Sequence, residues 1–150
     1  MSDVLKKLEE DIKSAMRARE QLRLDTVRLI KSAVKNKEIE LIRALTELEF
    51  FGLLSTLLKQ RRESIEQYEK GGRPDLADKE KLEIEIIQGY LPKQLSTDEL
   101  NSLIRSVVQK VGATGPKDIG KVMGELKSQT SGRVDGKILA DTVKQILGSL

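Results

Sequence analysis

Residues 116–127, PKDIGKVMGELK, carry the clearest pattern in the chain. Wound at about 100° per residue, they place an apolar stripe on one side of a helix: Ile119, Val122, Met123 and Leu126. Gly120 and Gly124 fall on the opposite side, with Lys117 and Lys121. Glycine inside a helix costs roughly 1 kcal/mol relative to alanine. A bare backbone between two ammonium groups suits the close approach of an anionic partner. The alternatives are a tolerated, solvated face or a contact within the same protein.

The composition is that of a globular chain built on aliphatic side chains. Of the 150 residues, 38% are hydrophobic, 34% are charged and only 3% are aromatic. No apolar run approaches the roughly 20 residues that span a bilayer. The chain has neither cysteine nor histidine, so it lacks thiolate chemistry, the usual general base and the commonest transition-metal ligand. We expect no metal and no cofactor.

Charge is unevenly distributed along the sequence. Residues 1–91 contain 18 basic and 18 acidic residues, whereas residues 92–150 contain nine and six, which is the whole net charge of +3. The C-terminal part is therefore the better surface for phosphate. The N-terminal stretch MSDVLKKLEED lacks the apolar core of a signal peptide. Together with the absence of cysteine, it predicts a cytoplasmic location.

The first 91 residues predict a domain of about four helices. Residues 3–20 form the first, and Asp25 is the expected N-cap of the second. Thr46 and Glu49 form a capping box that opens a long third helix, and Pro74 suits the first turn of a fourth. The second helix carries a basic ridge, which is either a solvated edge of the core or a secondary binding surface: Arg28, Lys31 and Lys35.

Residues 92–150 predict a second domain of three short helices, after Pro92 closes the preceding one. Ser96 with Glu99 starts the first helix, Gly112 ends it, and Asp135 caps the last. No stretch alternates with period two for long enough to indicate a strand. The sequence therefore predicts an all-α protein with a boundary near residues 91–95, and no membrane span.

Patterns for catalysis are incomplete. The run from Gly115 through Gly120-Lys121-Val122 resembles a phosphate loop, but Val122 replaces the hydroxyl that would hold magnesium, and no strand precedes it. Ser32 and Lys35 fit S-x-x-K without any companion cluster. Other charges are interpreted as helix surface or solvated charge, among them Lys59, Arg61, Arg62, Glu63, Glu66, Glu69 and Glu83. No catalytic residue is predicted, and enzymatic activity stays open.

Residues 131–137, SGRVDGK, are a further candidate for an anion contact. Gly132 permits a tight turn and Asp135 caps the last helix, so Arg133 is held between two fixed points. Such an arginine either contacts phosphate or pairs with a nearby carboxylate, Asp135 or Asp141.

Several stretches together resemble the YqeY-like family, small bacterial proteins whose C-terminal part is similar to the tail domain of the B subunit of the tRNA-dependent amidotransferase. They are DTVRLIKSA (25–33) with Asn36 and Glu38, KQRRESI (59–65), YLPKQLS (90–96), GKVMG (120–124) and GRVDGK (132–137). Val134 departs from the alanine usual in the family, which puts the shape of that loop in doubt.

The resemblance implies a two-part helical fold and a link to tRNA. The candidate RNA-binding residues are Lys117, Gly120, Lys121, Gly124, Arg133 and Lys137. The family label, a carbon–nitrogen ligase with glutamine as amido-nitrogen donor, rests on the tail similarity, whereas amide hydrolysis and carboxylate activation belong to other domains of the full enzyme. Three hypotheses follow: a tRNA-binding module, a subunit that assists amidation of aminoacyl-tRNA beside an amidotransferase partner, or a protein–protein adaptor without a nucleic-acid role.

Overall fold

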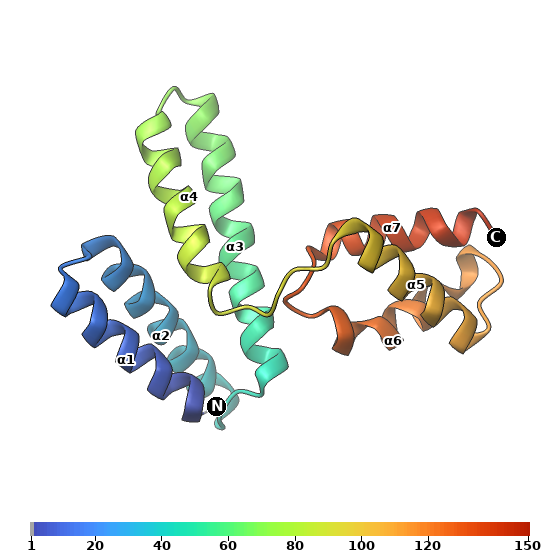
Figure 1. Ribbon diagram of the computed structural model, residues 1–150, viewed down its shortest axis with the longest axis horizontal. Helices are drawn as coiled ribbons and strands as arrows, with labels where there is room; N and C mark the ends of the chain where they lie inside the picture. Colours follow the sequence, from blue (N-terminus) through green and yellow to red (C-terminus); the bar gives the residue numbers. More distant parts are fainter. Residues whose placement is uncertain (1) are drawn as a thin grey trace. The chain divides into compact units, whose positions relative to one another are not determined.

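A computed structural model describes residues 2–150, and these form two compact units. The first ends at Leu91 and the second spans Pro92–Leu150. Within the described residues the secondary structure consists of seven α-helices and one 3-10 turn, with no strand (Figure 1). The prediction of an all-α fold is confirmed.

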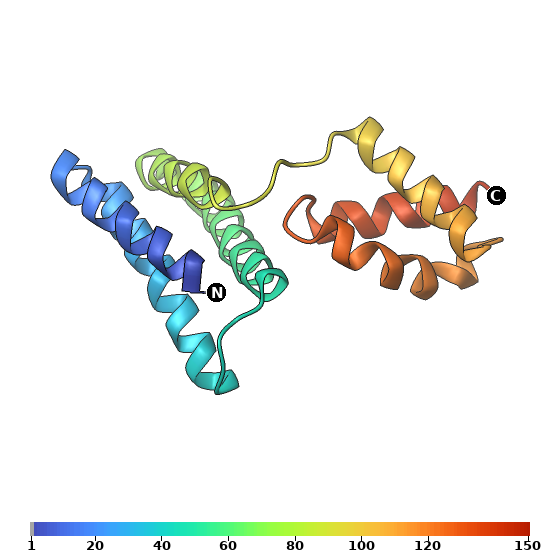
Figure 2. The same ribbon diagram turned by 60° about the horizontal axis from the view of Figure 1, so that its bottom comes forward.

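The first unit consists of two antiparallel helical hairpins. Helices α1 (Ser2–Ala18) and α2 (Gln21–Leu41) form one, and α3 (Glu47–Lys70) and α4 (Pro74–Gln88) form the other (Figure 2). The side chains that meet between them are almost fully buried, and the core includes Leu8, Val27, Ile30, Val34, Phe50, Leu54, Leu58 and Ile87. Because this core is aliphatic apart from Phe50, the shortage of aromatic residues does not prevent close packing.

Helix α2 starts earlier than the sequence predicted. The N–H of Glu20 donates to the carbonyl of Ala15 at 3.0 Å, and Arg19 adopts a left-handed conformation with φ of +58°. This turn reverses the chain at once, so α2 begins at Gln21. Asp25 lies inside the helix and accepts a hydrogen bond from the Gln21 side chain at 2.8 Å. The proposed N-cap at Asp25 is therefore wrong.

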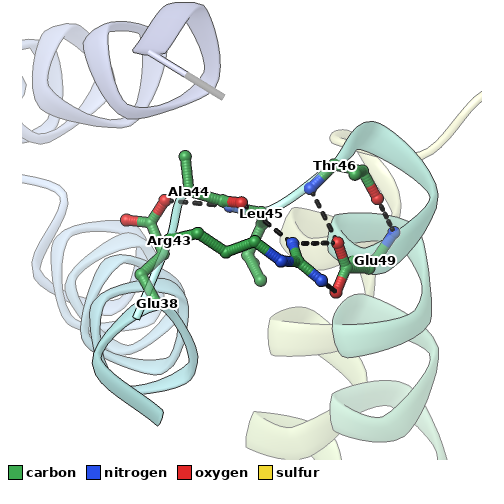
Figure 3. A network of polar contacts seen from close by, with 6 residues as sticks. All are labelled: Glu38, Arg43, Ala44, Leu45, Thr46 and Glu49. Carbon is green, nitrogen blue, oxygen red and sulfur yellow. Dashed lines mark hydrogen bonds and ion pairs between the residues drawn. The ribbon is translucent and has the colours of Figure 1, made fainter. Parts of the chain in front are cut away.

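The capping box at the start of α3 is confirmed and has an additional partner (Figure 3). Thr46 Oγ1 accepts from the Glu49 N–H at 3.2 Å, and a Glu49 carboxylate oxygen accepts from the Thr46 N–H at 3.1 Å. Arg43 donates to both oxygens of the same carboxylate, at 2.7 and 3.0 Å. A carboxylate that accepts three hydrogen bonds strongly favours its charged form, and the pKa of Glu49 is lowered to about 2.

The end of α2 is anchored within the same connection. Glu38 accepts a hydrogen bond from the N–H of Leu45 at 3.1 Å, and Leu45 is buried (Figure 3). Ile42, the C-cap of α2, has φ of +58° and is 90% exposed. A β-branched residue in the left-handed region is a genuine outlier, so this cap stores backbone strain without burial of its side chain.

Arg61 in α3 is a buried residue, contrary to its interpretation as helix-surface charge. Its Nε donates to a carboxylate oxygen of Glu83 in α4 at 2.9 Å, and its Nη1 donates to the carbonyl of Leu57 at 3.3 Å. The side chains of Arg61 and Glu83 are 10% and 14% exposed. Glu83 was also expected to be solvated, and this pair instead joins α3 to α4 in a desolvated setting.

The second unit packs three helices around its own core. Helix α5 (Thr97–Val111) is followed by the 3-10 turn η1 (Pro116–Asp118), α6 (Ile119–Thr130) and α7 (Gly136–Gly148). Ser96 and Asp135 cap α5 and α7 through their side chains, and Gly112 ends α5 with φ of +68°, all as predicted. The core residues are Leu100, Ile104, Val107, Val108, Val122, Leu126, Leu139, Val143 and Leu147. Ile138, in the first turn of α7, is 55% exposed and lies outside this core.

Candidate nucleic-acid interface

The glycine side of α6 faces away from the core of its unit. Val122 and Leu126 are fully buried, while Gly120 and Gly124 are exposed. A Cβ atom added at either glycine would meet nothing within 4 Å. The backbone of α6 is therefore open to a partner along one full turn, and neither glycine is required by packing within the protein.

The ammonium groups beside these glycines form no salt bridge with a described residue, although the charge of Lys121 contributes to lowering the pKa of Asp118. Lys117 and Lys121 are exposed, and in the part of the chain that the structure describes neither forms a salt bridge. The acidic residue within α6, Glu125, is paired with Lys110 of α5. Asp118 accepts a hydrogen bond from the N–H of Thr114 at 2.9 Å, and this bond is the main reason its pKa is lowered.

Lys127 also belongs to this face, although the sequence reasoning did not include it. It is exposed and lies seven residues after Gly120, which is two helical turns along the same side. The spacing could have identified it, because i, i+4 and i+7 positions share a helix face. The α6 face thus consists of Lys117, Gly120, Lys121, Gly124 and Lys127, the name used below for this surface.

Arg133 is fixed by the segment that leads into the unit. Gly132 has φ of +75°, and its carbonyl accepts from the Gln94 side chain at 2.7 Å. The carbonyl of Arg133 accepts from the N–H of Leu95 at 2.8 Å, and the Arg133 Nε donates to the carbonyl of Lys93 at 3.2 Å. The half-buried arginine is therefore held by backbone carbonyl groups, a contact that neither alternative from the sequence included.

Lys137 lies in the first turn of α7, and its side chain is exposed. Its backbone N–H donates to the Asp135 carboxylate at 2.7 Å. The cap therefore occupies one of the amide groups that an anion would use at a helix N-terminus. Any contact from Lys137 must come through its ammonium group.

The candidate residues form two groups rather than one site. Lys117 lies in η1 and Lys121 in the first turn of α6, whereas Arg133 and Lys137 follow the end of α6. With 12 residues, α6 is about 18 Å long at the usual rise per residue. A single small ligand cannot reach both groups, but an extended polyanion with regularly spaced phosphates can.

The basic ridge of α2 is not a continuous patch. Lys31 is half-buried and pairs with Glu9 of α1 at 3.3 Å. The Nη2 atom of Arg28 lies 4.0 Å from the sulfur of Met16, and Lys35 is exposed. One of the three cations is thus neutralised within the unit, which weakens the ridge as an anion surface.

The structure does not assemble a catalytic cluster from the S-x-x-K pair. Ser32 lines a hollow between α2 and α3, whereas Lys35 lines a different one beside α1. Among residues 2–150 there is no group of three acidic, histidine or cysteine side chains placed to hold a metal. None of the described helices combines the length and the apolar character needed to cross a bilayer.

Comparison with known proteins identifies the family. The family model described as Yqey-like protein matches residues 5–147. The chain belongs to the YqeY-like family. This confirms the resemblance inferred from the sequence stretches, and it extends over both units, so the α6 face and the Arg133 turn lie within the matched region.

Similar family members include proteins named "Altered inheritance of mitochondria protein 41, mitochondrial". The one from Kluyveromyces lactis is 32% identical over 146 residues, covering 95% of this chain and 75% of its own length. The one from Vanderwaltozyma polyspora is 36% identical over 120 residues, covering 75% and 64%. The one from Pyrenophora tritici-repentis is 28% identical over 149 residues, covering 97% and 82%.

These names correct the expected location. All three relatives are named as mitochondrial proteins, so the prediction of a cytoplasmic location is overturned. The inference failed because the absence of cysteine excludes disulfides but does not identify a compartment. The N-terminal stretch was compared only with the pattern of a secretory signal, and that comparison has no bearing on other destinations.

Proposed function

We propose that the second unit is a binding module for structured RNA, with tRNA as the candidate implied by the family resemblance. The observation that carries this proposal is the α6 face, where two open glycines lie between ammonium groups that form no salt bridge among residues 2–150. Backbone exposed along one helical turn permits the closest approach that a helix allows. The phosphate backbone of a nucleic acid is negatively charged, so its attraction to the ammonium groups grows as it approaches the open helix backbone.

The arrangement supports recognition by shape more than by sequence. None of the four aromatic residues lies in residues 92–150, so the unit has no ring on which a base can stack. The two groups of cations, at opposite ends of α6, suit successive phosphates along a helical backbone. Recognition of double-stranded RNA uses such contacts with phosphates and 2′-hydroxyl groups. We expect modest affinity with a marked dependence on salt.

The test is a titration of unfractionated tRNA against the full chain at two ionic strengths. Because the two groups are far apart, Lys121→Glu and Arg133→Glu are tested separately. Each should weaken binding and reduce the slope of log affinity against log salt by about 1. The matched control is Lys13→Glu, an equal charge change at an exposed position of α1. Equal affinity for all four proteins, or binding that ignores salt, would overturn the proposal.

An adaptor role is the second candidate, because open glycines also allow another helix to pack closely. The names of the relatives mention neither RNA nor amide transfer. The adaptor would be favoured if the native chain retains a protein from nuclease-treated lysate and the Gly124→Leu variant does not. The native chain would in that case show no binding of tRNA in the titration.

A role in glutamine-dependent amidation requires a partner, since Ser32 and Lys35 line separate hollows. The purified chain should then show no glutaminase activity. Turnover that Ser32→Ala abolishes would establish an active site in the first unit.

A further inference from the structure

A hollow of about 480 Å³ lies between α2, α3 and α4 of the first unit. Three apolar side chains line it, the exposed Leu29, the half-buried Ala33 and the buried Leu57. Its walls are polar, and the groups that line them are Ser32, Asn36, Gln60, Arg61, Ser64 and Glu80. Small-ligand sites have this composition, an apolar surface with a few convergent polar groups.

The wall contains a charge arrangement that packing alone does not require. Arg61, whose side chain is 10% exposed, lies 2.9 Å from a carboxylate oxygen of Glu83 but 3.9 Å from Glu80. Arg61 is therefore shared by two carboxylates, with Glu83 closer than Glu80, and the three side chains together carry one more negative charge than positive. Glu80 is itself only 20% exposed. A desolvated charge that lacks full compensation is costly, which makes this position a candidate for a binding role.

The titration of Glu80 agrees with that geometry. Burial is the main cause that raises the pKa of this carboxyl group, and the negative charge of Glu83 raises it further. Arg61 and Lys79 oppose the shift but do not reverse it. An additional cation next to Glu80 would relieve the repulsion between the two carboxylates.

The neutral groups on the wall favour the same kind of ligand. Ser32 and Ser64 carry hydroxyl oxygens, and Asn36 and Gln60 carry amide oxygens, so all four can accept hydrogen bonds. The hydroxyl of Ser64 already donates to the carbonyl of Gln60 at 3.0 Å, which leaves its lone pairs for a ligand. An ammonium group has three donors and no acceptor.

We propose that this hollow binds a small ligand with a primary alkylammonium group, held by Glu80 and the surrounding hydroxyl and amide oxygens, with its alkyl part on Leu29, Ala33 and Leu57. The site is independent of RNA binding by the second unit. Its size accommodates a short alkyl chain, and the net single negative charge of Arg61, Glu80 and Glu83 matches a single positive charge.

The experiment is an NMR titration of the full ¹⁵N-labelled chain with propylammonium chloride, at constant ionic strength. Saturable shifts are expected for the backbone amides of Ser32 and Ser64 and for the side-chain amides of Asn36 and Gln60. Sodium chloride is the control for a general effect of salt. Binding of 1-propanol measures the contribution of the apolar side chains without a charge, and binding of propionamide measures that of a neutral polar group. The proposal is overturned if propylammonium gives no saturable shift, or if either neutral probe binds equally well.

Substitutions separate the carboxylate from its surroundings. Glu80→Gln should weaken propylammonium binding about tenfold or more, because a hydrogen bond to a charged group is lost. Glu85→Gln, an exposed position on the same helix, should leave the affinity unchanged. Asn36→Asp adds a carboxylate to the wall and should strengthen binding, which provides a gain of function that a folding defect cannot mimic. Unchanged affinity in Glu80→Gln, or weaker binding in Asn36→Asp, would refute the assignment.

Discussion

Arg43, in the exposed connection between α2 and α3, donates to both carboxylate oxygens of Glu49 in the first turn of α3, at 2.7 and 3.0 Å. The hydrogen bonds from Arg43 are the largest cause that lowers the pKa of Glu49 to about 2. Since the folded-state pKa lies below the usual value of 4.5, Glu49 contributes stability that is complete above about pH 4.5 and is lost as the pH falls through about 2.

Glu49→Gln should therefore lower the free energy of unfolding near neutral pH, and the difference from the native chain should shrink toward acid pH. Urea unfolding of both proteins from neutral pH down to about pH 2 measures this difference. Comparison with the glutamine variant isolates Glu49 from the other carboxyl groups that titrate in the same range. A difference that stays constant with pH would mean that the charged form of Glu49 is not what the network stabilises.

The Arg61–Glu83 pair should behave as a desolvated ion pair. Arg61→Leu should lower the free energy of unfolding by about 3 kcal/mol, because it leaves the carboxylates of Glu83 and Glu80 without their cation. Glu83→Leu should cost less, because Glu80 still lies 3.9 Å from Arg61. The double variant should lose much less than the sum of the single variants. Urea unfolding of the four proteins provides the coupling energy. Lys59→Leu, at an exposed position of α3, should change stability by no more than about 0.5 kcal/mol.

Gly124 and Gly52 form a matched pair for testing the α6 face. Both are exposed, both lie inside a helix, and a Cβ atom at either would meet nothing within 4 Å. Replacing either by alanine should raise the free energy of unfolding by about 1 kcal/mol. Only Gly124→Ala should also weaken tRNA binding. If both variants bind tRNA as well as the native chain does, the bare backbone of α6 is a tolerated feature and not a contact surface.

Replacing Ile42 or Arg19 by glycine should raise the free energy of unfolding. Each has φ of +58°, and this conformation costs a residue with a Cβ atom roughly 1–2 kcal/mol. Part of that gain is offset by the greater freedom of glycine in the unfolded chain. We expect thermal unfolding to shift upward for Ile42→Gly, by about 1 kcal/mol in free energy, and by less for Arg19→Gly. A downward shift at Ile42 would show that its side chain has a stabilising contact.

The sequence predicted the elements whose signals are local. The capping residues Thr46, Ser96 and Asp135 act within three residues of the helix start, and Gly112 ends α5 through its own backbone conformation. The start of α2 was missed because Arg19 and Glu20 make a tight turn without glycine or proline. No residue propensity identifies such a turn, in which the exposed Arg19 takes the left-handed conformation and its N–H donates to the carbonyl of Met16 at 3.2 Å.

The features of the candidate sites that depend on local sequence could be predicted, and those that depend on a distant partner could not. The open side of α6 follows from helix periodicity, so Gly120 and Gly124 were placed correctly as exposed. The burial of Arg61 does not, because its partner Glu83 is 22 residues away and on another helix. A helical wheel shows that Arg61 lies among other charges but not which element covers it. Whether the α6 face meets RNA stays a prediction.

The hydrogen bonds between residues 93–95 and the turn at Gly132 and Arg133 have a practical consequence for the design of fragments of the protein. Three hydrogen bonds join these two stretches. A C-terminal fragment that began at the first helix, at Ser96, would cut away one side of all three and release the arginine from its support. Weak binding by such a truncated piece would report damage at the cut, so an informative fragment has to begin at Pro92.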